Sequence, residues 1–307
     1  MSRRRVRATL VDRLSGRVLI LDGGMGISLQ ARGLPRGHPP DLWSVEQPEE
    51  VRLVHEAFVE AGADIIFTNT FGASRLRLDR YGWGDRVIDL NRAAVGLARA
   101  VAKGKAIVAG DIGPCGPVGA TFRQLSRPEV ISLYAEQIQA LASAGVDLLV
   151  IETISDLEEM KVTVTAARSV APDLPVLASL TFTRDGVLRS GEGPAAAARA
   201  LEAMGVDIVG ANCSFGFASL LPICEEMAKA TTLPLAMKPS AGVPPAPPPS
   251  ADEAAEYARR FVEAGAALMG GCCGVDPAML RAIALAIKGM PVVRRPAVVP
   301  SLTKAQG

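Results

Sequence analysis

One hydrophobic pattern recurs four times along the chain: a helix end, a single glycine and then an unbroken run of apolar residues. The four segments are VEAGADIIFT (59–68), SAGVDLLVIE (143–152), AMGVDIVGANC (203–213) and EAGAALMGGCC (263–273). Glycine readily adopts the left-handed conformation that often follows a helix. An apolar run without alternation is typical of a strand that is buried on both faces. The pattern therefore predicts four helix-to-strand units.

Four more apolar runs lie before or between these units and add four strands to the prediction. They are VLILD (18–22), KAIVAGD (105–111), PVLASLTF (175–182) and PLAMKPS (234–240). The stretches between the strands have the apolar spacing of amphipathic helices, most clearly at 48–62 and 128–145. The residues predicted to face the core of these two helices are Val51, Val54, Phe58 and Ala61, and Val130, Tyr134, Ile138 and Leu141.

Strands and helices that alternate eight times predict an α/β fold, namely a single (β/α)8 TIM barrel. The alternative is an open, doubly wound sheet, in which so regular a repetition is rare. No change in composition indicates a second domain, so we expect residues 1–307 to form one barrel domain with its core at about 15–290. The proline-rich run 243–250 predicts a stiff, extended loop after the seventh strand.

Composition excludes several classes of protein. Lys and Arg number 33 against 32 Asp and Glu, so no basic excess indicates binding to nucleic acid or to an anionic membrane. No window approaches the ~18 uninterrupted apolar residues of a membrane span, and no signal-peptide core follows the N-terminal arginines. Five cysteines are too few and too odd a number for a secreted disulfide framework. We expect a cytoplasmic protein, whose oligomeric state the sequence leaves open.

The positions of three cysteines indicate a metal site. Cys213 ends the sixth predicted strand, and Cys272 and Cys273 end the eighth. Functional residues of TIM barrels lie at the C-terminal ends of strands, and two strand steps of ~4.8 Å separate these two ends by roughly 10 Å. Adjacent cysteines in a regular strand would point to opposite faces. Flanking glycines let the chain turn both sulfurs the same way; these are Gly270, Gly271 and Gly274.

Three thiolates with an open fourth position are typical of a catalytic zinc site, because structural zinc sites normally close all four positions. Soft thiolates also select zinc or copper(I) over magnesium. The residues alone leave two alternatives open: cysteines packed in the core and a redox-active cysteine pair. Of the other two cysteines, we expect Cys115 near the barrel mouth and Cys224 in helix packing. The two histidines, His38 and His55, we expect to be structural.

Six motifs resemble the homocysteine S-methyltransferase family, which includes the homocysteine-binding module of cobalamin-dependent methionine synthase and the betaine- and S-methylmethionine-dependent enzymes. The motifs are LDGGMGISLQARG (21–33), ADIIFTNTFGAS (63–74), LLVIETISDLEEMK (148–161), GANCS (210–214), PSAGVP (239–244) and GGCCG (270–274). The resemblance extends over about residues 15–290. It implies a zinc-dependent transfer of a methyl group to homocysteine, giving methionine.

The resemblance also assigns roles to individual residues. It implies Zn²⁺ on Cys213, Cys272 and Cys273, with the homocysteine sulfur as fourth ligand and no protein general base. Asp22 and Glu152 match the acidic positions that receive the substrate ammonium group. Two further residues, Gly23 and Thr70, are expected to offer backbone or hydroxyl donors to the substrate. Ser240 stands at a substrate-contact position where methionine-synthase-like members often have Asn.

The methyl donor is the least determined feature. Trp43 resembles the tryptophan position of the betaine and S-methylmethionine enzymes, where an aromatic face can hold a sulfonium or quaternary ammonium group; packing against the barrel is the alternative. The segments 69–74 and 239–244 look closer to the methionine synthase module, whose methyl group arrives on a corrinoid. We expect no corrinoid- or folate-binding region within the residues that follow the predicted barrel. Three hypotheses follow: an enzyme using a small donor, a homocysteine-binding subunit that needs a methylcorrinoid protein, or a zinc–thiol redox sensor.

Overall fold

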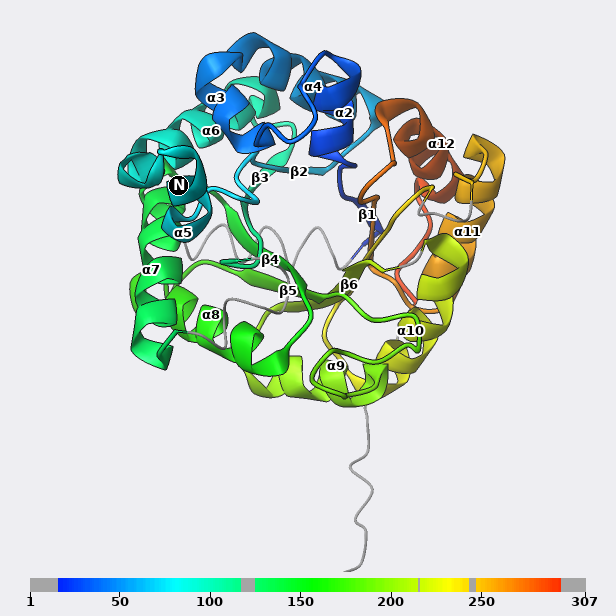
Figure 1. Cartoon of the computed structure of the whole chain (residues 1–307). Helices are drawn as coiled ribbons and strands as arrows, with labels where there is room; N and C mark the ends of the chain where they lie inside the picture. Colours follow the sequence, from blue (N-terminus) through cyan, green and yellow to red (C-terminus); the bar gives the residue numbers. More distant parts are fainter. Residues whose placement is uncertain (1–15, 117–124, 215, 243–246, 294–307) are drawn as a thin grey trace, which may run out of the picture.

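The computed structural model describes residues 16–116, 125–214, 216–242 and 247–293. In this part of the chain, parallel strands form one sheet of eight in the order β1-β8-β7-β6-β5-β4-β3-β2. A bridge between Leu21 and Ile65 joins the β1 end to β2, so the sheet closes on itself. Helices surround this central ring of strands (Figure 1). The predicted (β/α)8 TIM barrel is confirmed.

The strands are short and lie within or beside the predicted apolar runs. They are β1 Leu19–Ile20, β2 Ile65–Phe67, β3 Ile107–Ile112, β4 Leu148–Ile154, β5 Val176–Leu180, β6 Ile208–Cys213, β7 Leu235–Pro239 and β8 Leu268–Met269. The helical segments are α2 Met25–Ala31, η1 Pro40–Leu42, α3 Trp43–Glu46, α4 Pro48–Ala61, α5 Arg75–Leu78, η2 Asp79–Tyr81, η3 Gly84–Arg86, α6 Val87–Ala102, α7 Arg127–Ala144, α8 Leu157–Val170, α9 Pro194–Ala203, α10 Phe217–Ala230, α11 Ala251–Glu263 and α12 Pro277–Ile287. Among the described residues, no helix is both long and apolar enough to cross a membrane.

The glycines of the repeated pattern end helices as predicted. Gly62, Gly145, Gly205 and Gly265 have φ values of 110°, 93°, 73° and 110°, in the region that glycine enters without a steric penalty. Both amphipathic helices, α4 and α7, form at their predicted positions, and the eight residues predicted to face their cores are buried. Of the proline-rich loop, residues 243–246 lie outside the described residues, and 247–250 have no regular structure before α11.

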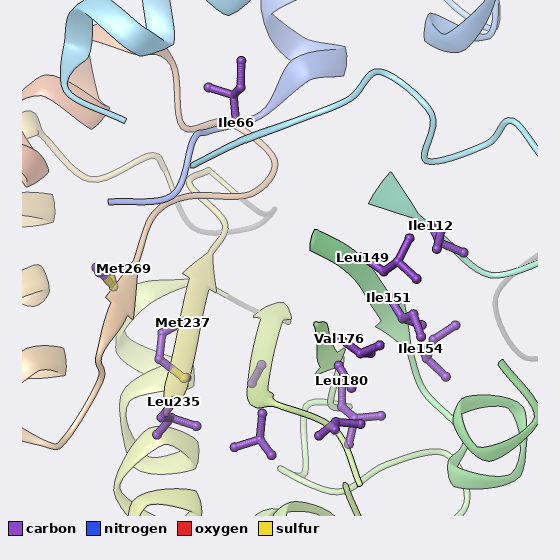
Figure 2. Close-up of a cluster of buried hydrophobic side chains, with 14 of the residues drawn as sticks. Ile66, Ile112, Leu149, Ile151, Ile154, Val176, Leu180, Leu235, Met237 and Met269 are labelled. Carbon is purple, nitrogen blue, oxygen red and sulfur yellow. The ribbon is translucent and has the colours of Figure 1, made fainter. Parts of the chain in front are cut away.

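Two apolar layers hold the barrel together, one on each side of the sheet. Alternate residues of a strand point to opposite faces, so β4 sends Leu148 and Val150 to one layer and Leu149 and Ile151 to the other. The inner layer consists of strand and strand-end residues packed against one another. The outer layer joins the strands to the surrounding helices, and Figure 2 shows part of it, including Leu149 and Ile151.

The inner rows change from apolar to polar toward the C-terminal ends of the strands. On three strands the step of two residues leads from the inner apolar layer to an ionisable side chain: Ile107, Ala109, Asp111 on β3; Leu148, Val150, Glu152 on β4; and Ala236, Lys238 on β7. The fold thus places charged residues at the mouth of an apolar barrel.

Candidate metal centre

Three cysteine sulfurs converge at the mouth of the barrel. The Sγ atoms of Cys213, Cys272 and Cys273 all lie within 4.8 Å of one another. Tetrahedral zinc with bonds of ~2.3 Å would hold its sulfurs ~3.8 Å apart, so a small approach of the side chains suffices. Three soft donors from two separate strand ends therefore fit a thiophilic metal ion.

The backbone leaves strand geometry at both ends that carry these cysteines. The β8 strand stops at Met269, and Cys273 and Gly274 form a turn in which Gly274 has φ of 80°. A side chain at Gly274 would meet the Ala241 carbonyl oxygen at 2.0 Å, so only glycine fits this approach. Cys213 itself has φ of 59°, which is uncommon for a residue other than glycine. Such backbone strain is often concentrated at functional sites.

Hydrogen bonds within the cluster already favour a thiolate. The thiols of Cys272 and Cys273 hydrogen-bond to Cys213 and lower its pKa to about 3, while the hydrogen bonds that Cys273 makes to Cys213 and Cys272 raise the pKa of Cys273. The Ser240 hydroxyl donates to the Cys213 sulfur at 3.5 Å. The cluster therefore favours a negative charge on Cys213, shared through hydrogen bonds with the other two thiols.

Asn212 links the cysteine cluster to the neighbouring strands. Its Oδ1 accepts hydrogen bonds from the Thr153 backbone N–H at 3.0 Å and from the Ser179 hydroxyl at 2.7 Å. Its Nδ2 donates to Thr153 Oγ1 at 2.8 Å and approaches the Cys272 sulfur at 3.8 Å. Thr153 has φ of 63°, a rare conformation for a β-branched residue. Asn212 therefore stabilises the irregular backbone beside Glu152 while also contacting a candidate metal ligand.

A cavity of about 590 Å³ opens beside the sulfurs. Its lining includes seven of the residues predicted from the sequence: Asp22, Gly23, Thr70, Glu152, Cys213, Cys272 and Cys273. Gly23 packs so closely that an added Cβ would lie 2.4 Å from the Val275 carbonyl oxygen. The cavity thus joins the candidate metal ligands to the candidate substrate residues.

Lys238 lies among the carboxylates of this cavity. Its Nζ is 3.1 Å from Asp22 Oδ1 and 3.9 Å from Glu152 Oε2, and it sits 3.5 Å from the centroid of the Phe67 ring. Burial alone would lower the pKa of Lys238, but the attraction of Asp22 and Glu152 outweighs it and raises the pKa. Lys238 is therefore a buried, permanently charged group.

The carboxylates are only partly compensated by this lysine. Burial raises the pKa of Glu152 to about 7 despite the attraction of Lys238, and burial also raises that of Asp22. Burial and the charge of Glu152 raise the pKa of Asp111 well above its ordinary value. Asp111 Oδ1 and Glu152 Oε2 are buried without a hydrogen-bond partner. Such uncompensated polar atoms are costly unless a ligand satisfies them.

Three predicted residues lie where a direct role is less well supported. Thr70 lines the cavity, but its hydroxyl donates to the Asp111 carbonyl oxygen at 2.7 Å and its N–H to the Thr68 carbonyl oxygen. Ser240 is fully buried behind Cys213 and is not part of the cavity lining. Trp43 is also outside the lining and packs in the outer hydrophobic layer. This placement favours the packing interpretation of Trp43.

The remaining cysteines and histidines lie away from the cavity. Cys115 follows the end of β3 but is fully buried, with its sulfur 3.7 Å from Glu159 Oε1, so it does not line the cavity at the mouth. Cys224 packs in the core on α10, as predicted. His38 pairs with Glu46 at the surface, and His55 is buried in α4, where burial lowers its pKa to about 4. Neither histidine lines the cavity.

Sequence reasoning missed three residues of the site: Asp111, Asn212 and Lys238. Each stands two residues after an inner position of its strand, at Ala109, Gly210 or Ala236 respectively. Counting in steps of two from the inner apolar layer would have identified all three.

The model of the family described as "Homocysteine S-methyltransferase" matches residues 19–287. The chain belongs to this family. It is 32% identical to a methionine synthase of Mycobacterium tuberculosis over 94% of this chain, and spans about a quarter (26%) of that relative's length. The homocysteine methyltransferase MmuM from Escherichia coli, in its metallated form, superposes with a TM-score of 0.77 at 26% identity. That superposition covers 91% of this chain and 98% of MmuM.

The oxidised form of the same Escherichia coli enzyme gives a TM-score of 0.78 at 26% identity, over 93% of this chain and 99% of that chain. The family model and the Escherichia coli structures therefore match this chain over nearly the whole barrel. In this member of the family, the barrel mouth combines three convergent cysteines with a cluster of buried charges.

Proposed function

We propose that this chain is a zinc-dependent homocysteine S-methyltransferase, which transfers an activated methyl group to the sulfur of homocysteine and so forms methionine. The observation that carries the proposal is the convergence of Cys213, Cys272 and Cys273 on one side of a cavity lined by carboxylates. All five cysteines are free, which suits action in a reducing cytoplasm.

The donor set favours zinc among the metals. Three cysteine sulfurs are soft ligands, and a three-residue site leaves a fourth position for substrate. When bound, Zn²⁺ would lower the pKa of the homocysteine thiol and keep a nucleophilic thiolate at neutral pH.

The chain's own residues bind and orient the substrate. Carboxylates of the cavity would receive its ammonium group, and the close packing of Gly23 shapes the wall beside them. No histidine is among the described residues that line the cavity. This lining fits a reaction in which no protein side chain needs to act as general base.

A second candidate function is that of a homocysteine-binding subunit whose methyl group comes from a methylcorrinoid protein. The identity with methionine synthase over the barrel favours it, as does the position of Trp43 outside the cavity lining. S-methylmethionine and betaine are the donors that the first candidate would use.

A donor panel tests the proposal. Zinc-loaded protein is incubated with homocysteine and, in turn, S-methylmethionine, betaine or methylcobalamin, and methionine is measured. Methionine from a small donor identifies a self-sufficient enzyme, and methionine from methylcobalamin alone favours the corrinoid-dependent subunit. X-ray absorption at the zinc edge should show a fourth sulfur neighbour when homocysteine is added. An unchanged zinc environment and no methionine would contradict both candidates and leave a thiol sensor.

A further inference from the structure

We propose that Asp111, at the end of β3, receives the ammonium group of homocysteine together with Glu152. Asp22 is left out because it already forms an ion pair with Lys238. The proposal rests on the proposed function for the identity of the substrate. It adds Asp111 to the binding residues and separates Asp22 from them, so the two carboxylates singled out from the sequence have different roles.

Asp22 has little capacity left for a ligand. Its Oδ2 accepts the Phe67 backbone N–H at 2.7 Å, and its Oδ1 accepts Lys238 Nζ at 3.1 Å. Only 2% of the residue is exposed. A buried carboxylate with one hydrogen bond on each oxygen and an adjacent ammonium is already compensated. Asp22 therefore holds Lys238 in place and needs no second cation.

Asp111 and Glu152, unlike Asp22, each have an oxygen that accepts no hydrogen bond. Each is 7% exposed, lines the cavity and carries a buried oxygen without a hydrogen-bond partner, Oδ1 in Asp111 and Oε2 in Glu152. In the strand register Asp111 pairs with Val150, so Glu152 is the next residue of β4 on the same side of the sheet. The pair thus brings two acceptors without a hydrogen bond to one cavity, and only Glu152 Oε2 has a cation nearby, Lys238 Nζ at 3.9 Å.

Carboxylates outnumber cations at this end of the cavity, so one more cation would be stabilised there. Three carboxylates face a single lysine at this end of the cavity, while the fourth acid of the lining, Asp41, is attracted by Arg77. Besides burial, Glu152, Asp22 and Asp41 all repel the charged form of Asp111 and help to raise its pKa. A cation between Asp111 and Glu152 would offset both the repulsion and the missing hydrogen bonds.

A ligand that satisfies the free oxygens of Asp111 and Glu152 must carry N–H donors as well as a positive charge. A primary ammonium has three donors in a compact group, which suits acceptors from two side chains. A sulfonium or a quaternary ammonium has no N–H group and is held best on an aromatic face. The two phenylalanines of the lining already carry cations on their rings: Lys238 lies 3.5 Å from the Phe67 centroid and Arg77 lies 5.3 Å from that of Phe71. The geometry therefore favours the amino acid acceptor over the methyl donor.

Two thiols that differ only in the ammonium group test the proposal. Zinc-loaded protein is titrated calorimetrically with L-homocysteine and with 4-sulfanylbutanoate, which lacks the amino group. Asp111→Asn should weaken homocysteine binding about 10- to 100-fold, the range for losing a charge-assisted hydrogen bond. The same variant should bind 4-sulfanylbutanoate within about twofold of wild type, because that thiol makes no contact with Asp111.

Asp147→Asn is the matched control. Asp147 is a carboxylate outside the cavity lining, where it accepts the Val108 backbone N–H at 2.9 Å and pairs with Arg99. We expect this variant to bind homocysteine as wild type does. Zinc content and thermal midpoint are measured for each variant, and Asp111→Ser replaces Asp111→Asn if the latter does not fold.

Three results would overturn the proposal. The first is wild-type homocysteine affinity in Asp111→Asn and Asp111→Ser. The second is equal affinity of the wild-type protein for the two thiols, which would mean that Lys238 fills the place of the ammonium; thiol binding to zinc would then survive while the role of Asp111 fails. The third is binding of neither thiol by zinc-loaded wild type, which would overturn the proposed function itself.

Discussion

The barrel mouth has two halves with different construction. The sulfur half consists of Cys213, Cys272 and Cys273 at the ends of β6 and β8, and its backbone is irregular, with positive φ at Cys213 and Gly274. The carboxylate half consists of Asp22, Asp111 and Glu152 around Lys238. Asp111, Glu152 and Lys238 stand within strands, and only β4 is irregular there, with a register shift between Ile151 and Ile154.

The difference teaches how each half obtains its specificity. Sulfurs from two separate strands must turn toward one point, so the sulfur half requires glycines and a strained backbone. Charges at the top of an apolar barrel need only the two-residue alternation of a strand, but their burial makes every missing partner costly. Asn212 joins the halves, since it contacts both Thr153 beside Glu152 and the sulfur of Cys272.

The largest expected effect comes from removing one sulfur. Cys272→Ala should lower zinc affinity more than 100-fold and abolish methyl transfer, because losing a residue that merely supports a ligand already costs about 10–100-fold. Zinc is measured by competition with a chelating indicator, and methionine formation is measured in parallel. Cys224→Ala on α10 is the control and should retain metal. Full turnover by Cys272→Ala would show that the sulfur half is not a metal site.

The carboxylate half should respond in folding stability instead. Lys238→Met removes the cation and leaves Asp22 and Glu152 buried without it, so the free energy of unfolding should fall by about 3–5 kcal/mol. Urea unfolding of the metal-free protein measures the change. Adding Asp22→Asn to the variant should recover part of the loss, because one uncompensated charge disappears. A loss below about 1 kcal/mol would show that Lys238 does not neutralise this half.

The sulfur half and the fold could be predicted from the sequence for related reasons. Unbroken apolar runs after glycine define buried strands, and strand ends of a barrel meet at one mouth, so the positions of Cys213, Cys272 and Cys273 followed from counting strands. The flanking glycines also indicated that the chain leaves strand geometry at Cys272, which the structure shows.

The carboxylate half was harder to predict because its members look ordinary in the sequence. Lys238 stands in a buried strand, where a lysine is rare unless paired, and its partner Asp22 lies 216 residues away. Asp111 follows apolar residues that continue the strand, so no motif separates it from a surface charge. Cys115 looked like a residue of the cavity lining because it follows a strand end. In the structure, hydrogen bonds with Tyr134 and Glu159 hold its segment inside the protein.

The pH dependence of stability sharpens the contrast between the halves. Burial raises the pKa of Glu152 from its ordinary 4.5 to about 7 in the folded protein, so the folded state binds the proton more tightly. Stability from Glu152 is therefore present below pH ~4.5 and is lost as pH rises through about 7, by a total of about 3 kcal/mol. In metal-free protein, the free energy of unfolding of wild type relative to Glu152→Gln should fall by that amount between pH 4.5 and 8. A difference independent of pH would contradict the burial of an uncompensated carboxylate.

The smallest expected effect is at Ser240, which belongs to the sulfur half although the sequence placed it against the substrate. Its hydroxyl donates to the Cys213 sulfur at 3.5 Å and lies outside the cavity lining. Ser240→Ala should therefore weaken zinc binding by about tenfold, as for other groups that support a metal ligand. At saturating zinc, its homocysteine affinity in calorimetric titration should equal that of wild type. If homocysteine affinity falls while zinc affinity is unchanged, Ser240 contacts the substrate and does not belong to the sulfur half.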